Sequence, residues 1–138
     1  MSIRRTAANR GQPDVTVDFD HHESAPRRVR RALEPLIATE GDPIANDVRL
    51  VVSELVSNVV QHTRDGGIMR AWDPKPDVPF RLEVADPDER GAACPTTDDH
   101  GGRGLQIVNE LADDWGVERT DRGKTVWAEF DRIKASVR

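Results

Sequence analysis

One apolar stripe in the middle of the chain constrains its fold more than any other feature. Between residues 48 and 62, valines and leucines recur every three or four positions, which is the spacing of one face of an α-helix. The members of this stripe are Val48, Val51, Val52, Leu55, Val56 and Val59. Only Arg49 and Glu54 carry a full formal charge in this segment, fewer than a helix surrounded by solvent usually has. The pattern therefore predicts a helix that packs on one side against a sheet.

The start of this helix carries its own signal. Gly41 precedes Asp42 and Pro43. The Asp42 carboxylate can accept a hydrogen bond as the N-cap, and Pro43 in the first turn has no N–H to lose. We therefore expect the helix to begin at Pro43 and to run to His62.

The other segments predict five strands and two more helices. Alternation of apolar and polar residues indicates the strands, and spacings of three and four indicate the helices. Pro35 lies inside the first helix, which we expect to kink or end early because an interior proline costs about 3 kcal/mol. This order predicts an α+β two-layer sandwich, with helices on one face of a mixed, mainly antiparallel sheet. The expected strands are 14–19, 68–72, 80–86, 115–118 and 124–130, and the expected helices are 25–37 and one from about 103.

Length and charge bound the protein class. The 138 residues suit one domain, which we place at 14–134 after a polar arm at 1–13 that we expect to be disordered. The net charge of -5 disfavours direct binding of nucleic acid. No apolar run approaches the roughly 18 residues of a membrane span, so we expect a cytoplasmic protein without membrane contact. Cys94 is the sole cysteine and is interpreted as a loop residue.

Polar residues line one flank of the central helix. Glu54 and Asn58 stand four positions apart, so their side chains emerge one turn apart on the same stripe. The Asn58 amide oxygen could occupy one Mg²⁺ position, and Glu54 could take a proton from an attacking hydroxyl. Taken alone, the pair also fits a polar helix border. His62 extends the stripe, and a helix-end histidine favoured by the helix dipole is the alternative to a catalytic one.

Two later segments supply further candidates. Asp86 ends a strand on its apolar side, where an ionised carboxylate needs hydrogen-bond donors. The exocyclic amine of adenine is one candidate donor, and the turn that follows the strand offers the alternative. The glycine-rich turn at 101–104 opens directly into a helix, an arrangement suited to phosphate. Arg103 within it could contact phosphate or face solvent. Thr125 begins the last strand, where it is either a surface residue or a water-mediated contact to a base.

These polar segments, taken together and in this order, resemble the motifs of the Bergerat ATP-binding fold of gyrase and histidine-kinase relatives. The similarity covers roughly residues 14–131 and is strongest to the small anti-sigma factor serine kinases and regulatory ATP-binding proteins of actinobacteria. The residues that carry it are Glu54 and Asn58, Asp86 with Gly91, Gly102 to Leu105, and Thr125 to Trp127. It favours the functional interpretation of Glu54, Asn58 and Asp86.

The resemblance implies a role for each matching residue. Asn58 would ligate Mg²⁺, and Glu54 would act as general base. The remaining roles concern ATP: Asp86 would read adenine, Gly91 would permit close approach of the base, Gly102, Arg103, Gly104 and Leu105 would wrap the phosphates, and Thr125 would support Asp86. One departure is Asp88, which stands where the family commonly has glycine and predicts looser base binding.

The implied activity is transfer of the ATP γ-phosphoryl group to a serine of a STAS-type anti-sigma factor antagonist. The resemblance also implies that the protein binds and sequesters a sigma factor. A homodimer is a further possibility. Two alternatives remain open. One is a non-catalytic, ATP-sensing protein-interaction module, and the other is a plain α+β interaction module with a degenerate pocket.

Overall fold

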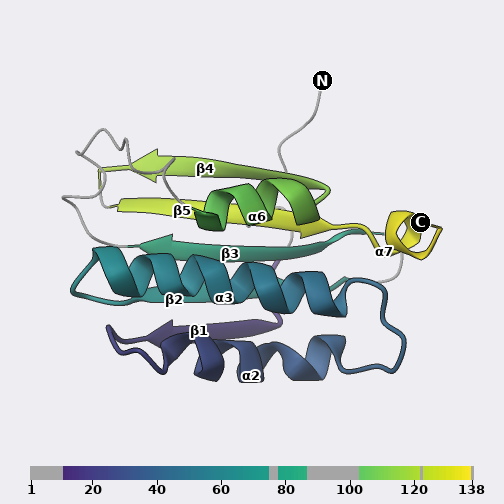
Figure 1. The fold of residues 1–138 in the computed structure, drawn as a ribbon, viewed down its shortest axis with the longest axis horizontal. Coiled ribbons are helices and arrows are strands. Elements are labelled where there is room, and N and C mark those ends of the chain that lie inside the picture. Colours follow the sequence, from purple (N-terminus) through teal and green to yellow (C-terminus); the bar gives the residue numbers. More distant parts are fainter. Residues whose placement is uncertain (1–10, 75–77, 87–102, 122, 138) are drawn as a thin grey trace.

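The computed structural model describes residues 11–74, 78–86, 103–121 and 123–137 (Figure 1). Within them the elements follow the predicted order of strand, two helices, two strands, helix and two strands, with one short helix added at the end. In chain order they are β1 (Val15–Phe19), α2 (Ala25–Ile37), α3 (Ala45–His62), β2 (Gly67–Trp72), β3 (Phe80–Asp86), α6 (Arg103–Leu111), β4 (Asp114–Thr120), β5 (Gly123–Phe130) and α7 (Arg132–Ser136).

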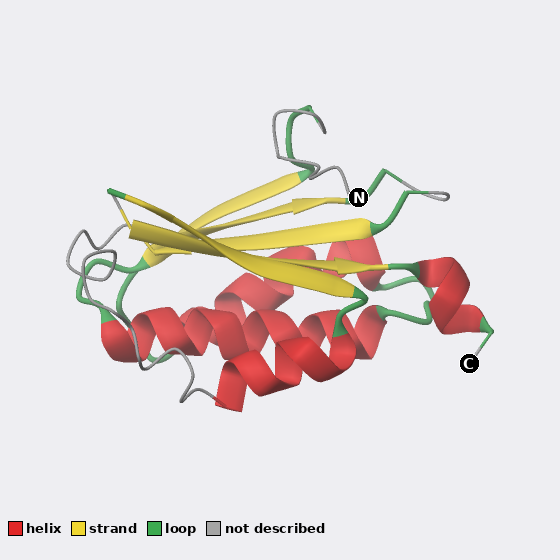
Figure 2. Ribbon diagram, turned by 90° about the horizontal axis from the view of Figure 1, so that it is seen from above, coloured by secondary structure: helices red, strands yellow, loops and turns green. Residues whose placement is uncertain are grey.

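The five strands form one open sheet in the order β1-β2-β3-β5-β4, and every pairing among the described residues is antiparallel. Helices α2, α3 and α6 lie side by side on one face of this sheet, with α3 in the middle (Figures 1 and 2). The predicted α+β two-layer sandwich is therefore confirmed. Its sheet, expected to be mixed and mainly antiparallel, is antiparallel in every described pairing.

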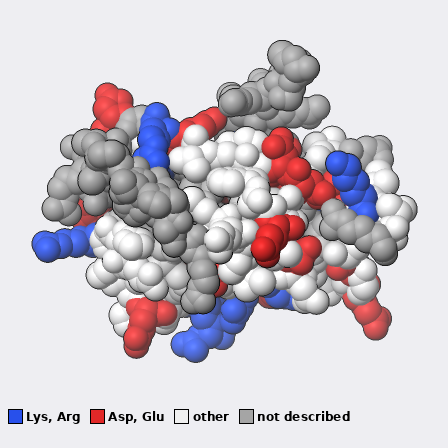
Figure 3. Space-filling model, turned by 45° about the horizontal axis from the view of Figure 1, so that its top comes forward, with Lys and Arg blue, Asp and Glu red and all other residues white. Residues whose placement is uncertain are grey.

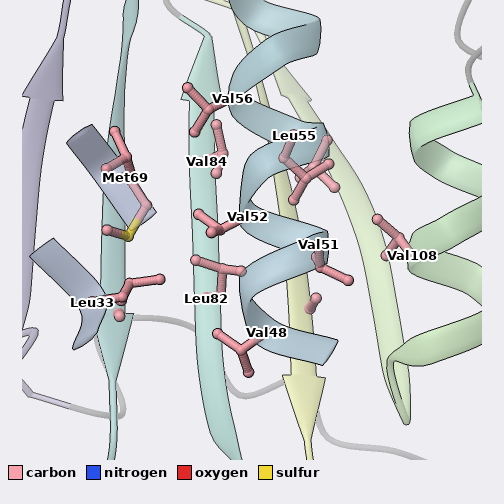
Figure 4. Close-up of a cluster of buried hydrophobic side chains, with 14 of the residues drawn as sticks. Leu33, Val48, Val51, Val52, Leu55, Val56, Met69, Leu82, Val84 and Val108 are labelled. Atoms are coloured by element: carbon pink, nitrogen blue, oxygen red, sulfur yellow. The ribbon is translucent and has the colours of Figure 1, made fainter. Parts of the chain in front are cut away.

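Helix α3 forms the centre of the core. Val48, Val52 and Val56 lie against Leu82 and Val84 of β3, all of them nearly or fully buried (Figure 4). Val51 and Leu55 lie on the side of α3 that faces Val108 of α6 (Figure 4). Each such side chain contributes about 1.5–3 kcal/mol relative to an exposed one. Helix α3 is therefore covered by the sheet, by α6 and, on its other edge, by α2. This burial explains why the apolar stripe dominates the sequence pattern.

Two helix boundaries differ from those expected. Helix α3 begins at Ala45 with Ile44 as its N-cap, two residues after Pro43, although the Asp42 carboxylate still accepts a hydrogen bond from the Ile44 N–H at 3.2 Å. Helix α2 continues through Pro35 to Ile37. Because Pro35 lies in the last turn and faces solvent, it costs one hydrogen bond, while Leu33 and Ile37 are fully buried and hold the turn in place.

Buried charge stabilises the sheet face that carries no helix. The Arg81 side chain is only 3% exposed, and its guanidinium contacts Glu83 and Glu129, each at 2.9 Å. It also lies 4.5 Å from the centroid of the Trp127 ring. Gly116 sits beneath that ring, where an added Cβ would approach it within 2.8 Å. The exposed face of the sheet is therefore held by a compact ionic and aromatic cluster.

The C-terminal helix α7, which the sequence pattern did not predict, is tied to the rest of the domain through Arg132. Its guanidinium contacts Asp42 before α3 at 2.9 Å and Asp73 after β2 at 2.7 Å. These two carboxylates are 4% and 1% exposed. The side chain of Asp131 caps the helix by accepting from the Ile133 and Lys134 N–H groups.

A second, more exposed ion pair joins α2 to α3. Glu34 and Arg49 form two hydrogen bonds of 2.8 and 2.9 Å, with about a third of each side chain exposed. The bond from Arg49 lowers the pKa of Glu34. The pair therefore stabilises the fold above the ordinary Glu pKa of 4.5, and this contribution is lost as the pH falls through the lowered pKa.

We predict that Arg132→Ala lowers the free energy of unfolding by about 3–5 kcal/mol, because it leaves two buried carboxylates without their cation. Arg49→Ala is the matched control and costs no more than about 1 kcal/mol, since its pair is partly solvated. Urea denaturation at neutral pH measures both. Equal losses for the two variants would contradict the role assigned to Arg132.

Candidate functional site

The predicted site residues of α3 lie on the flank that faces α6. Val51 lies on this side of the helix (Figure 4), and Glu54 and Asn58 follow it by three and seven positions, close to one and two helical turns. Both side chains are half-buried, whereas His62 is exposed. The structure thus brings Glu54 and Asn58 to the junction of α3 and α6 and leaves His62 in solvent.

The hydrogen bonding of α3 differs between its two flanks. On the α2 side, Arg49 pairs with Glu34, and Ser53 accepts a hydrogen bond from Arg30 at 3.4 Å. On the α6 side, Glu54 and Asn58 have no side-chain partner among the described residues. Half-buried polar groups are normally satisfied. Within the part of the chain that the structure describes, a carboxylate and an amide one turn apart are therefore available to a ligand.

The remaining candidates converge on the same end of the domain. Strand β3 ends at Asp86, α6 begins at Arg103 with its first turn directed towards this end, and the C-terminal half of α3 lies beside them (Figure 1). Gly91 and Gly102 lie outside the described residues. The side chain of Arg103 is also outside them.

Asp86 is a buried carboxylate, 6% exposed, at the end of β3. Its alternation with Leu82 and Val84 places it on the helix-covered face of the sheet, as predicted. Its partner across β5 is Lys124, and residues opposite each other in antiparallel strands share a face. Lys124 and Asp86 thus lie side by side on the covered face.

Thr125 does not lie beside Asp86. It pairs with Ala85, so its side chain belongs to the opposite face of the sheet. The sequence contained the signal for this: Val126, Ala128 and Phe130 alternate as the apolar side of β5, and Lys124, not Thr125, is in phase with them. The structure therefore places Lys124, which the sequence pattern did not single out, opposite Asp86.

Helix α6 is anchored so that its first turn is held near α3. Val108 is fully buried on the side of α6 that faces α3 (Figure 4). Leu105 is half-buried and packed on the same core. The first N–H groups of a helix lack partners inside the helix and carry the positive end of its dipole. The first turn of α6 is thus a place where an anion can bind close to the Asn58 flank.

The donor set at this site suits one kind of metal ion. Among the described residues, no group of three or more His, Cys, Asp or Glu side chains could hold a metal. The available donors are the Asn58 amide oxygen and the Glu54 carboxylate. Mg²⁺ commonly uses one or two protein oxygens and completes its shell with water and phosphate oxygens, so the residues fit this ion.

Helices long and apolar enough for a membrane span are absent from the described part of the chain.

Comparison with known proteins extends these observations. The family model of the histidine kinase-like ATPase domain matches residues 15–130. A crystal structure of the RsbU and RsbW domains of a Mycobacterium tuberculosis protein is similar, with a TM-score of 0.65 and 21% identity over 85% of this chain and 32% of that one. The histidine kinase domain of a blue-light activated histidine kinase from Erythrobacter litoralis is also similar. Its TM-score is 0.55, with 18% identity over 93% of this chain and 73% of that one. No curated protein matches the chain.

We predict that Val108→Ala loosens α6 and lowers the free energy of unfolding by about 1.5–3 kcal/mol, because two buried methyl groups are lost next to α3. Val117→Ala on β4, where the side chain is 36% exposed, is the control and costs less than about 0.5 kcal/mol. Urea denaturation measures the cost, and hydrogen exchange shows faster amide exchange in α6 for the first variant alone. Unchanged exchange in α6 would rule out Val108 as its anchor.

Proposed function

Because the chain belongs to the histidine kinase-like ATPase domain family, we propose that it binds Mg·ATP and acts as an anti-sigma factor type regulator with serine kinase activity. The observation that carries this proposal is the pair of half-buried side chains, Glu54 and Asn58, which lie beside the start of α6 and have no partner within the described residues.

Three groups would bind the nucleotide. The buried carboxylate of Asp86 suits the exocyclic amine of adenine, a donor that compensates the loss of hydration. The first turn of α6 would receive the phosphates. By the family resemblance, Gly102 to Leu105 would wrap them. Asn58 would hold Mg²⁺, which when bound neutralises charge on the phosphates and orients them.

Glu54 would be the general base of the transfer. It stands one turn before Asn58, on the same flank, so a serine hydroxyl presented to the phosphates would also reach its carboxylate. The serine oxygen would form a bond to the γ-phosphorus as the bond from that phosphorus to the bridging oxygen of ADP breaks. The hydroxyl proton would pass to Glu54, and ADP would leave with the electron pair of the broken bond.

The substrate and partners follow from the family resemblance and from the RsbW-containing neighbour. We infer that the phosphoacceptor is a serine of a STAS-type anti-sigma factor antagonist and that a sigma factor is the second partner, in the cytoplasm. A homodimer is compatible with this scheme. The net charge of -5 supports protein partners over nucleic acid.

The environment of Asp86 supports a second candidate, a non-catalytic module that senses ATP. Lys124 lies opposite Asp86, and Thr125, expected to support it, lies on the other face of the sheet. Together with Asp88 in place of the family's glycine, this arrangement around Asp86 predicts lower affinity for the adenine base and slow turnover of ATP. Under this alternative, binding of Mg·ATP alone shapes the surface that partners recognise.

We predict that Glu54→Ala retains Mg·ATP binding within about twofold but abolishes transfer of labelled phosphate to a STAS-domain protein, a loss of at least about 10²-fold. The control is Gln61→Ala, an exposed position on the same helix, which behaves as wild type. If wild type binds ATP, transfers no phosphate to any STAS protein tested, and Glu54→Ala still controls partner binding, the sensing module is correct and the kinase is not.

Asn58→Ala separates metal binding from chemistry. We expect calorimetry to show that its affinity for ATP no longer increases when Mg²⁺ is added, because the metal has lost its amide ligand. Circular dichroism should show an unchanged fold. Wild type that binds no Mg·ATP at millimolar nucleotide would refute both functional candidates and leave a plain interaction module.

We further predict that Asp86→Asn weakens ATP binding at least about tenfold, since the amide replaces one acceptor by a donor towards the adenine amine. Asp18→Asn, on the exposed side of β1, is the matched control and changes the affinity less than twofold. Calorimetry with ATP and GTP gives the comparison. An ATP preference that survives in Asp86→Asn would show that this carboxylate does not read the base.

A further inference from the structure

Helix α2 concentrates positive charge in an acidic protein. Its 13 residues contain four arginines and one glutamate, whereas the whole chain has a net charge of -5. By contrast, the face seen in Figure 3 carries acidic side chains among uncharged atoms near its centre, and its Lys and Arg lie towards the margins. The charge of α2 is therefore a local feature that a partner can recognise.

Only part of this charge is used inside the domain. Arg28 pairs with Asp20 of the preceding loop and lowers the pKa of that carboxyl through its hydrogen bond. Arg30 donates to Ser53 of α3. Arg27 and Arg31 are exposed and have no hydrogen bond or ion pair within the described residues. These two stand four positions apart, so their guanidinium groups occupy one stripe on the solvent side of α2.

An exposed leucine adjoins this stripe. Leu50 of α3 is 45% exposed, although most other apolar side chains of α3 are buried. The bond between Arg30 and Ser53 joins α2 to the turn of α3 that contains Leu50. Helices α2 and α3 lie side by side (Figure 1), so the two arginines and the leucine share the outer surface of the helix layer. We call Arg27, Arg31 and Leu50 the α2–α3 surface.

The α2–α3 surface continues directly into the proposed active site. Leu50, Glu54 and Asn58 succeed one another at intervals of four residues, each one turn further along α3. Each step of four also turns the stripe slightly towards α6. A protein that contacts Leu50 is therefore one helical turn from the proposed base, close enough to present a hydroxyl from an adjacent loop.

We propose that the α2–α3 surface docks an acidic helical segment of the phosphoacceptor protein, with carboxylates against Arg27 and Arg31 and an apolar side chain against Leu50. Charge complementarity carries the choice of an acidic partner, because complementary charges raise the association rate and select the partner. The leucine favours a folded protein surface over nucleic acid. That the partner is a phosphoacceptor rests on the proposed function, whereas docking itself requires no nucleotide.

The test measures docking without nucleotide by fluorescence anisotropy. The probe is a labelled, amphipathic 20-residue helical peptide with glutamates four positions apart beside a leucine stripe. We expect saturable binding that weakens with salt, a loss of at least about tenfold in Arg27→Glu/Arg31→Glu, and a smaller loss in Leu50→Ser. Lys134→Glu, an exposed site on α7, is the control for a reversal of charge and changes the affinity less than twofold.

Two comparison ligands decide what the surface recognises. They are vesicles with anionic headgroups and a 20-base-pair DNA duplex. Binding of either through the same arginines, with none of the peptide, would overturn the proposal, and so would equal peptide binding by the double variant and Lys134→Glu. Thermal denaturation of every variant checks the fold, and Arg27→Gln/Arg31→Gln replaces the double variant if that one unfolds.

The outcome separates docking from catalysis. Calorimetry with Mg·ATP is run on the same proteins, and the variants of the α2–α3 surface should bind nucleotide as wild type does. Peptide binding without ATP binding would refute the proposed function and leave the docking surface in place. ATP binding without any peptide binding would do the reverse.

Discussion

The burial of α3 on three sides is the constraint on which the rest of the structure depends. Its apolar face packs on β3, while its two edges pack against α2 and α6. A helix enclosed in this way has few positions left for polar groups, and those positions are fixed in direction by the packing. Glu54 and Asn58 therefore occupy a defined junction with α6, where rigid elements hold them in place.

The polar groups of the helix layer divide into those that hold the fold and those that do not. Glu34 with Arg49 and Arg30 with Ser53 join α2 to α3, and Arg132 joins α7 to the start of α3. In contrast, Glu54, Asn58, Arg27 and Arg31 have no partner among the described residues. Groups that form no such pair within the described part of the chain are those that a ligand or a second protein can use at little cost to stability. This division links the proposed site to the α2–α3 surface.

Much of the fold could be predicted because period and alternation report burial directly. The boundaries of β3 follow from the alternation over Phe80 to Asp86, and the family match is consistent with the predicted architecture. The start of α3 was placed too early, and α7 was missed, because five residues held by a cap and by Arg132 leave no periodic signal. The pairing of Arg81 with Glu129 joins strands far apart in sequence, which no local pattern reveals.

By itself, the sequence determined the order of elements, the buried face of α3 and the candidacy of Glu54, Asn58 and Asp86, because each depends on spacing within one element. The tertiary structure decided which of them lie together. It placed Lys124 rather than Thr125 beside Asp86, since strand register sets the face of each side chain. It also decided which charges are neutralised inside the domain and which remain at its surface, because ion pairs form between elements that only folding brings into contact.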